Sequence, residues 1–415
     1  MNKFKLWRTI MKLGNSATGE DFFGRTQELG DLWRYLKKDH IRFPGVRRLG
    51  KTSILLRLES DASEHGLLAK WLDVSNINTA KEFVTLLDCG FPENSIRRFV
   101  SDKAQQVGGW FKGVRKIDAK LPNVVGGGGF GIEFGGEAAP EWQKAAKILH
   151  SRLSDQPLLI LLDEFPVMLE KLIQQNRQEA EQILAWLRIW RQSSGNCRFV
   201  FTGSIGLQSL LERHGLGETM NDCFPYPLGP YKLTEARELW RHFALIADEA
   251  PWQVAEPVIA HALSRVGWLS PYFLCLLLDE SMRAARERRQ EDSCDAISEA
   301  RIEIEDVDNA YEKLLAERSR FHHWEKRLKS SLAPGDQDFC INLLNHLSRF
   351  PEGLTLDELS NRLAGREPDP DRRAQRLQEL LARLTDEGYT STPDGNRRLQ
   401  FLSFPLRDWW NRNHV

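Results

Sequence analysis

Three stretches of the sequence together predict an α/β fold built around a parallel sheet. The segment Gly45-Val46-Arg47-Arg48-Leu49-Gly50-Lys51-Thr52 matches G-x-x-x-x-G-K-[ST] at every fixed position. Residues 158–162 form an unbroken apolar run, as in strands buried on both faces, and the run ends in Asp163-Glu164. From residue 233 to residue 290 the apolar spacing becomes helical. These observations predict a P-loop NTPase core with flanking helices, followed by a helical lid.

The first of these stretches has the composition of a phosphate-binding loop. Glycines allow backbone N–H groups to wrap a phosphate chain, and the following helix adds the positive end of its dipole. Lys51 is suited to the β- and γ-phosphates, and the Thr52 hydroxyl to Mg²⁺. The alternative is a chance match in a glycine-containing turn. The expected nucleotide-binding residues here are Gly45, Val46, Arg47, Arg48, Leu49, Gly50, Lys51, Thr52 and Ser53.

The acidic pair after the apolar run supplies the other half of such a site. Asp163 is suited to holding Mg²⁺ with Thr52, and Glu164 to orienting and deprotonating the attacking water. The alternative is an acidic helix cap after a core strand. Together with Lys51, the pair favours hydrolysis of the nucleotide over binding alone.

A later strand, residues 198–204, also ends in small polar residues. In open α/β sheets ligands lie outside the carboxyl ends of strands, so Thr202 or Ser204 could sense the γ-phosphate. We favour Ser204, which could equally cap the next helix. The predicted catalytic residues are therefore Glu164, Asp163, Lys51 and Ser204. Upstream, residues 22–38 predict a helix that either packs over an adenine, with Arg25 near the phosphates or ribose, or simply faces the core.

The chain divides into four predicted segments. Residues 1–20 form an N-terminal arm, and residues 21–230 form the core, with a glycine-rich β-insertion at about 100–140. No Lys-[Ser/Thr] follows these glycines, so a second phosphate loop is the weaker interpretation. Residues 231–330 form the lid and a linker helix, including one long helix over 305–328. Residues 331–415 form the last domain.

The last domain has the element order of a winged helix. Helices are predicted at 339–347, 355–363 and 371–384, and a hairpin turn follows at Pro393-Asp394-Gly395-Asn396. A DNA-facing set would consist of Arg372, Arg376 and Arg383 on the third helix and Arg397 and Arg398 in the wing. Thirteen acidic and eleven basic residues from position 331 onward leave a protein-contact domain as the alternative.

Charge, cysteine spacing and apolar runs argue against a strongly basic nucleic-acid-binding protein, a disulfide-rich protein and a membrane-spanning protein. The formal net charge is −1 and the pI is about 6.8, so no bulk attraction to nucleic acid or membrane exists. The six cysteines are scattered without a C-x-x-C pair, which indicates neither a disulfide framework nor a metal site. No run approaches the roughly 18 apolar residues that span a bilayer. We expect a cytoplasmic protein without a membrane partner.

With these motifs in view, the chain resembles the archaeal-type P-loop ATPases of the STAND/AAA+ superclass, which also occur in bacteria. The likeness rests on Phe23-Gly24-Arg25, the phosphate loop, Asp163-Glu164-Phe165-Pro166, Thr202-Gly203-Ser204 and Gly267-Trp268…Pro271-Tyr272, and on the terminal winged helix. It implies ATP rather than GTP, and Pro271 as the lid's nucleotide-facing proline.

The resemblance also implies a slow, Mg²⁺-dependent ATPase switch. Its lid and winged helix would relay the nucleotide state to a partner protein or to self-assembly, with defence or stress response as a plausible setting. The alternative is a nucleotide-gated DNA-binding protein that acts through the winged helix.

Overall fold

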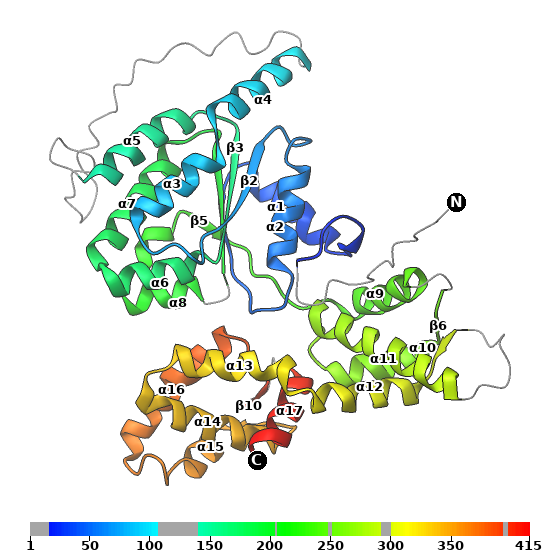
Figure 1. Cartoon of the computed structure of the whole chain (residues 1–415). Coiled ribbons are helices and arrows are strands. Elements are labelled where there is room, and N and C mark those ends of the chain that lie inside the picture. The colour runs from blue at the N-terminus through cyan, green and yellow to red at the C-terminus, as the bar shows by residue number, and fades with distance from the viewer. Residues whose placement is uncertain (1–15, 107–139, 204–205, 248–250, 292–299, 393–396) are drawn as a thin grey trace. The chain divides into compact units, whose positions relative to one another are not determined.

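The computed structural model describes residues 16–106, 140–203, 206–247, 251–291, 300–392 and 397–415 (Figure 1). The chain forms two compact units. One comprises Met1–Gly24, Val46–Gly50 and Gly229–Val415, and the other Arg25–Gly45 and Lys51–Leu228. The predicted glycine-rich insertion lies largely outside the described residues, and the four predicted segment boundaries stay predictions.

The second unit contains a five-stranded parallel sheet. Its strand order is β2-β3-β4-β1-β5. The strands are β1 (His40–Phe43), β2 (Leu68–Asp73), β3 (Leu158–Asp163), β4 (Arg198–Thr202) and β5 (Cys223–Pro225). Every residue of β3 is buried, because helices cover both faces of the sheet, as the unbroken apolar run predicts. Pro44 lacks an N–H and lies directly after β1.

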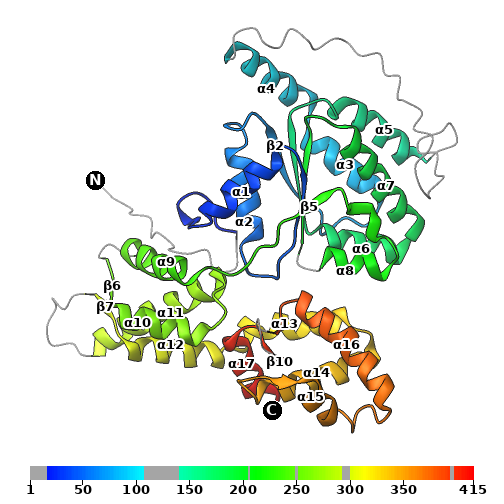
Figure 2. The ribbon, with the colours of Figure 1, turned by 180° about the vertical axis from the view of Figure 1, so that it is seen from behind.

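Helices flank this sheet on both sides, as Figures 1 and 2 show from opposite directions. One face carries α1 (Thr26–Leu36) and α2 (Lys51–Asp61). The other carries α3 (Ala80–Gly90), α5 (Glu141–Leu153), α6 (Phe165–Gln175), α7 (Arg177–Ser193) and α8 (Leu207–Arg213). The helix α4 (Glu93–Gln106) follows α3, and a 3₁₀ turn, Gly217–Met220, precedes β5. The α/β P-loop architecture predicted from sequence is thus present.

The first unit is mainly helical and has one continuous apolar core. A 3₁₀ turn, Gly19–Asp21, lies in its N-terminal part. Its first five helices are α9 (Leu233–Ile246), α10 (Glu256–Val266), α11 (Pro271–Glu291), α12 (Ile304–Ala316) and α13 (Arg318–Ser331). The short strands β6 (Gln253–Val254) and β7 (Arg301–Ile302) pair in parallel. The prediction of a single helix over 305–328 is wrong, because two helices cover these residues. Glu317 is extended (φ −77°, ψ 91°) and separates α12 from α13, so each helix buries its own apolar stripe in the core.

The C-terminal part of this unit has three helices and then two strands. These are α14 (Pro334–Ser348), α15 (Leu356–Arg362), α16 (Pro370–Asp386), β9 (Thr390–Ser391) and β10 (Arg398–Phe401). The strand β8 (Leu354–Thr355) pairs with β10 to give the antiparallel order β8-β10-β9. Thr355 and Glu358 form a capping box at the start of α15. The predicted turn 393–396 lies outside the described residues. A further helix, α17 (Phe404–His414), packs on α10, α12 and α14.

Two predictions from the sequence concern membrane-spanning segments and cysteines. Within the described ranges, no helix is long and apolar enough to cross a membrane. The cysteines that the structure describes are all free thiols.

Candidate nucleotide-binding site

The predicted phosphate loop lies between β1 and α2 in the chain. Two of its residues have left-handed backbone conformations, Arg48 (φ 70°) and Gly50 (φ 87°), and glycine adopts such a φ without steric cost. The helix α2 begins at Lys51, so the N–H groups of its first turn lie at the end of the loop. The Lys51 ammonium donates to the Gly45 carbonyl at 2.6 Å. Leu49 and Ser53 are buried.

Asp163 ends β3 and is buried, with 3% of its surface exposed. Its Oδ2 accepts a hydrogen bond from Thr52 Oγ1 at 2.6 Å and another from Trp71 Nε1 at 3.3 Å. Burial raises the pKa of Asp163, while the Thr52 hydrogen bond opposes that rise. The structure therefore brings together the two residues that the sequence assigns to the metal.

Glu164 follows with an unusual backbone conformation. It caps α6 at φ 57° and ψ 31°, a left-handed conformation that costs energy in a residue other than glycine. Its N–H donates to Asp163 Oδ1 at 3.1 Å. This conformation ends β3 abruptly and starts α6 at the next residue, so the two carboxylates lie at the carboxyl edge of the sheet.

The strand β4 ends beside this point. A Cβ on Gly203 would lie 2.3 Å from Pro166 Cδ and 3.6 Å from the Glu164 Cα, so only glycine fits there without a shift. The Thr202 hydroxyl is buried and donates to the Phe43 carbonyl at 2.9 Å, which ties β4 to β1. Thr202 is therefore part of the sheet framework. Ser204, the favoured sensor, lies outside the described residues.

The two remaining predicted nucleotide-binding residues are Arg25 and Pro271. Arg25 precedes α1 in a left-handed conformation, is 3% exposed, and pairs with Glu28 at 2.6 Å. Pro271 is the first residue of α11. Its neighbour Tyr272 lies beneath Arg48, whose guanidinium carbon is 4.0 Å from the ring centroid. Burial lowers the pKa of Arg48.

Solved structures with a similar fold cover almost the whole chain. The Walker-type ATPase PABY2304 of Pyrococcus abyssi is 16% identical, with 96% of this chain and 98% of that one covered and a TM-score of 0.57. The ORC2 protein of Aeropyrum pernix, solved as ADPNP–ADP complexes, is 16% identical, with 95% of each chain covered and a TM-score of 0.54. This chain has the α/β fold of a P-loop NTPase. No family model and no curated protein matches it.

Sequence reasoning missed two features of this P-loop site. Trp71 donates its indole N–H to Asp163, but nothing in an apolar strand sequence marks a tryptophan as a partner of a distant carboxylate. The left-handed conformation of Glu164 was also unforeseen, although the Pro166 that follows at the start of α6 signals a helix beginning there.

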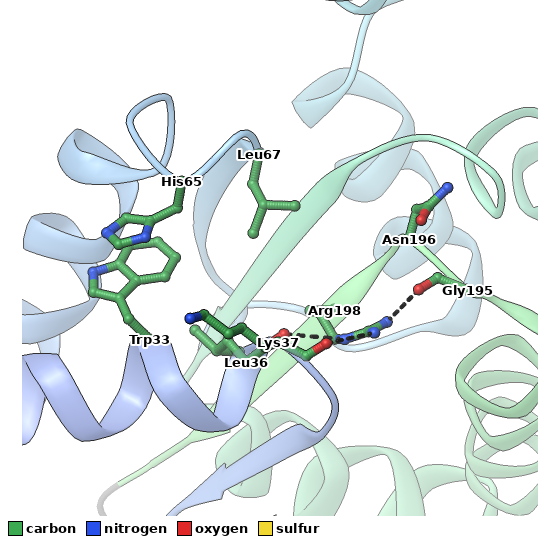
Figure 3. A pocket seen from close by; sticks show the side chains of 8 residues that line it. All are labelled: Trp33, Leu36, Lys37, His65, Leu67, Gly195, Asn196 and Arg198. Atoms are coloured by element: carbon green, nitrogen blue, oxygen red, sulfur yellow. Dashed lines mark hydrogen bonds between the residues drawn. The ribbon is translucent and has the colours of Figure 1, made fainter. Parts of the chain in front are cut away.

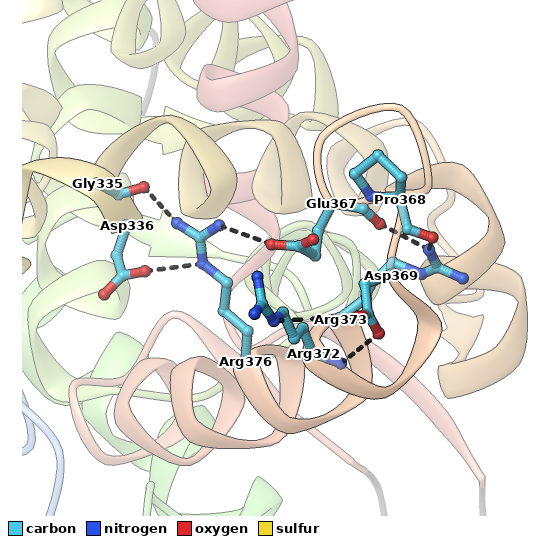
Figure 4. Close-up of polar contacts among 8 residues, drawn as sticks. All are labelled: Gly335, Asp336, Glu367, Pro368, Asp369, Arg372, Arg373 and Arg376. Atoms are coloured by element: carbon cyan, nitrogen blue, oxygen red, sulfur yellow. Dashed lines mark hydrogen bonds and ion pairs between the residues drawn. The ribbon is translucent and has the colours of Figure 1, made fainter.

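Most of the arginines predicted to face DNA form ion pairs with carboxylates of the C-terminal part, and Figure 4 shows those of Arg376. Arg376 Nε pairs with Asp336 Oδ1 at 2.8 Å, and its Nη1 lies 3.9 Å from Glu367. Arg383 pairs with Glu387 at 3.3 Å, and Arg398 with Glu358 at 3.2 Å.

The other two of these five arginines, Arg372 and Arg397, are more exposed. The side chain of Arg372 is 80% exposed and lies 3.9 Å from Asp369, and Arg397 is exposed. The face of α16 therefore presents much less free positive charge than its sequence indicates.

Proposed function

We propose that this protein is a Mg²⁺-dependent ATPase switch of the STAND/AAA+ type, in which nucleotide state is relayed to a partner protein or to self-assembly. The observation that carries the proposal is the 2.6 Å hydrogen bond between Thr52 Oγ1 and Asp163 Oδ2. It joins the start of the helix behind the phosphate loop to the end of a buried strand, with Glu164 as the next residue. The ADPNP and ADP complexes of the Aeropyrum pernix ORC2 protein support an adenine nucleotide.

The residues around this hydrogen bond fit a magnesium site. A hydroxyl and a carboxylate are the oxygen ligands that Mg²⁺ prefers, with water and phosphate oxygens completing its shell. Among the described residues no group of three His, Cys, Asp or Glu side chains could hold a metal, so the ion would depend on the nucleotide as well. When bound, it would neutralise charge on the phosphates.

The chain's own residues have distinct roles in this proposal. Lys51 exchanges its bond to the Gly45 carbonyl for the β- and γ-phosphates. Glu164 accepts a proton from the attacking water, and its position is fixed by the turn between β3 and α6. Ser204 senses the γ-phosphate, while Arg25 and Pro271 complete the nucleotide contacts.

A partner protein is favoured over DNA as the target of the winged helix. Binding to phosphates would require Arg376 and Arg383 to leave carboxylates that already pair with them, which removes much of the electrostatic gain. A cytoplasmic setting, and a place in defence or stress response, belong to the same proposal.

The test is ATP hydrolysis by the purified full chain beside Lys51→Ala and Glu164→Gln, each with and without duplex DNA. We expect turnover in the parent chain to fall by roughly 10²–10⁴-fold in Glu164→Gln, because a general base contributes about that much. Lys51→Ala is expected to lose nucleotide affinity as well, measured by titration with a fluorescent ATP analogue.

The matched control is Glu170→Gln, a change of the same chemistry further along α6. It should leave turnover within about twofold of the parent rate. Equal turnover in the parent chain and Glu164→Gln would refute the assigned role of Glu164. A rise in turnover with DNA, lost in Arg372→Ala, would favour the DNA-binding alternative.

A further inference from the structure

A cavity of about 230 Å³ lies at the amino ends of the strands, the opposite edge of the sheet from Asp163. Figure 3 shows the residues that line it. It is formed where the end of α1 meets the residues just before β2 and β4. Its lining consists of Trp33, Leu36, Lys37, His65, Leu67, Gly195, Asn196 and Arg198. None of these residues has a role in the proposed nucleotide site.

One wall of the cavity consists of two stacked rings and aliphatic side chains. The rings of Trp33 and His65 stack with centroids 3.8 Å apart and planes inclined by 16°. Leu36 and Leu67 add aliphatic surface, and Figure 3 shows both beside this ring stack. Sites for small organic molecules combine such apolar walls with a few fixed polar groups.

The fixed polar group is the Arg198 guanidinium, the first residue of β4. Its donors are held by backbone carbonyls, from Nε to Leu36 at 3.1 Å, from Nη1 to Gly195 at 2.9 Å and to Cys197 at 3.0 Å, and from Nη2 to Lys37 at 3.3 Å. A guanidinium has five N–H groups, so these four bonds orient it and leave one N–H of Nη2 for another acceptor.

The lining of this cavity carries two cations, Lys37 and Arg198. Among the described residues, no carboxylate lies within ion-pair distance of Arg198 or Lys37, and no acidic residue is part of the lining. Arg198 is partly buried, and partly buried cations in proteins are usually paired with an anion. Lys37 is exposed and adds a second positive charge to the lining. Two cations without an acidic partner, beside a flat apolar wall, are complementary to a ligand that carries its own negative charge.

We propose that this cavity binds a small organic anion, with a carboxylate or phosphate between Lys37 and Arg198 and a body of about one ring against Trp33 and His65. A volume of about 230 Å³ lies below the 300 Å³ at which drug-sized pockets begin, so a whole nucleotide is too large. The anion accepts hydrogen bonds from the remaining Nη2 N–H of Arg198 and from the Lys37 ammonium. The site is distinct from the phosphate loop.

The test uses benzoate and phenyl phosphate as probes and benzyl alcohol as the neutral counterpart of benzoate. Binding to the full-length protein is measured by saturation-transfer NMR titration, with saturating ADP present so that the phosphate loop does not contribute. A parallel titration uses Lys51→Ala without nucleotide. At least one of the two anions is expected to bind in both settings, and benzyl alcohol at least about tenfold more weakly, because the ionic contacts are lost.

The adjacent residues Lys37 and Lys38 provide a matched pair of variants. Both are exposed residues at the end of α1, but only Lys37 lines the cavity. Lys37→Met is expected to weaken anion binding about tenfold and Lys37→Arg to restore it, while Lys38→Met stays within about twofold of the parent. His65→Ala should weaken binding of either probe by removing one wall.

Several results would overturn the proposal. These are failure of both anions to bind, benzyl alcohol binding as well as benzoate, and equal losses in Lys37→Met and Lys38→Met. Retained binding in Lys37→Met with loss in Lys51→Ala would place the anion at the phosphate loop instead. Circular dichroism and thermal melts establish that each variant is folded. Lys37 and His65 are exposed, so substituting them is expected to leave the fold intact.

Discussion

Glu164 has a strained left-handed conformation, and Gly203, the residue after β4, lies close to it. The close approach of Gly203 to Pro166 leaves no room for a methyl group at residue 203. We therefore expect Gly203→Ala to lower the free energy of unfolding by about 1–3 kcal/mol, as overpacking of a filled site does. Because the displaced groups flank Glu164, ATP turnover should fall in the same variant. Thermal melts and the hydrolysis assay measure the two effects.

Gly30→Ala is the control for that substitution. Gly30 lies within α1, and a Cβ there would meet nothing within 4 Å. Alanine in a helix interior is favoured over glycine by roughly 0.5–1 kcal/mol, so this variant should melt at the same or a higher temperature. A Gly203→Ala protein as stable and active as Gly30→Ala would contradict the packing argument.

Single residues also show how far the sequence can predict a P-loop site. The loop residues and Asp163-Glu164 follow from a motif, because phosphate binding needs glycines and a lysine at fixed spacing. The Trp71 contact to Asp163 depends instead on β2 pairing in register with β3, where Asp73 lies opposite Asp163. Register between distant strands has no local signature, so such a partner is found only in the folded structure.

At the scale of an element, Arg376 connects α16 to its neighbours through several contacts. Arg376 contacts Asp336 and Glu367, donates to the Gly335 carbonyl, and lies over the Phe339 ring at 4.6 Å. We expect Arg376→Ala to lower the free energy of unfolding by about 1–3 kcal/mol, because it removes packing and leaves hydrogen-bond partners unsatisfied. Chemical denaturation with urea measures the change.

Arg372→Ala on the same helix is the comparison for Arg376→Ala. Its side chain is 80% exposed, and an exposed pair at 3.9 Å contributes little, so its stability should stay within about 0.5 kcal/mol of the parent. Equal destabilisation by both substitutions would mean that the contacts of Arg376 do not stabilise α16.

Among the elements, sequence prediction succeeded where the signal is local and long. The helix predicted over 371–384 lies within α16, and the apolar run gives β3. The three residues of β5 are too short to show alternation, and they include Pro225. The break at Glu317 contains neither glycine nor proline. It follows from how α12 and α13 pack into one core, which is information that no short window contains.

For the molecule as a whole, one buried histidine makes stability depend on pH. His40 Nδ1 accepts the Phe199 N–H at 3.2 Å, so Nε2 carries the proton and donates to the Arg191 carbonyl at 3.1 Å. Burial lowers the pKa of His40 from 6.5 to about 4. Between those values the unfolded chain binds a proton that the folded chain does not. The contribution of His40 to stability is therefore fully present above about pH 6.5 and is lost as the pH drops toward 4, by up to about 3 kcal/mol.

The prediction for His40 is checked by urea denaturation between pH 7.5 and 5. The parent chain should lose more stability over this range than His40→Gln, which cannot be protonated. Arg191 and Asp222, which form an ion pair at 2.8 Å nearby, stay in place in both proteins. His214→Gln, a histidine outside this network, should keep the parent's pH dependence. Identical pH dependence in the parent and His40→Gln would show that His40 is not the group responsible.

The strand β4 has Arg198 at one end and Thr202 at the other. Five residues of extended chain span about 16 Å, and Thr202 is bonded to Phe43 at the end of the strand that leads into the phosphate loop. Thermodynamic linkage is reciprocal: if nucleotide changes the affinity of the cavity for an anion by some factor, the anion changes nucleotide affinity by the same factor. If both proposed sites bind their ligands, a paired strand between them would let a small anion change the nucleotide concentration at which the phosphate loop is half occupied.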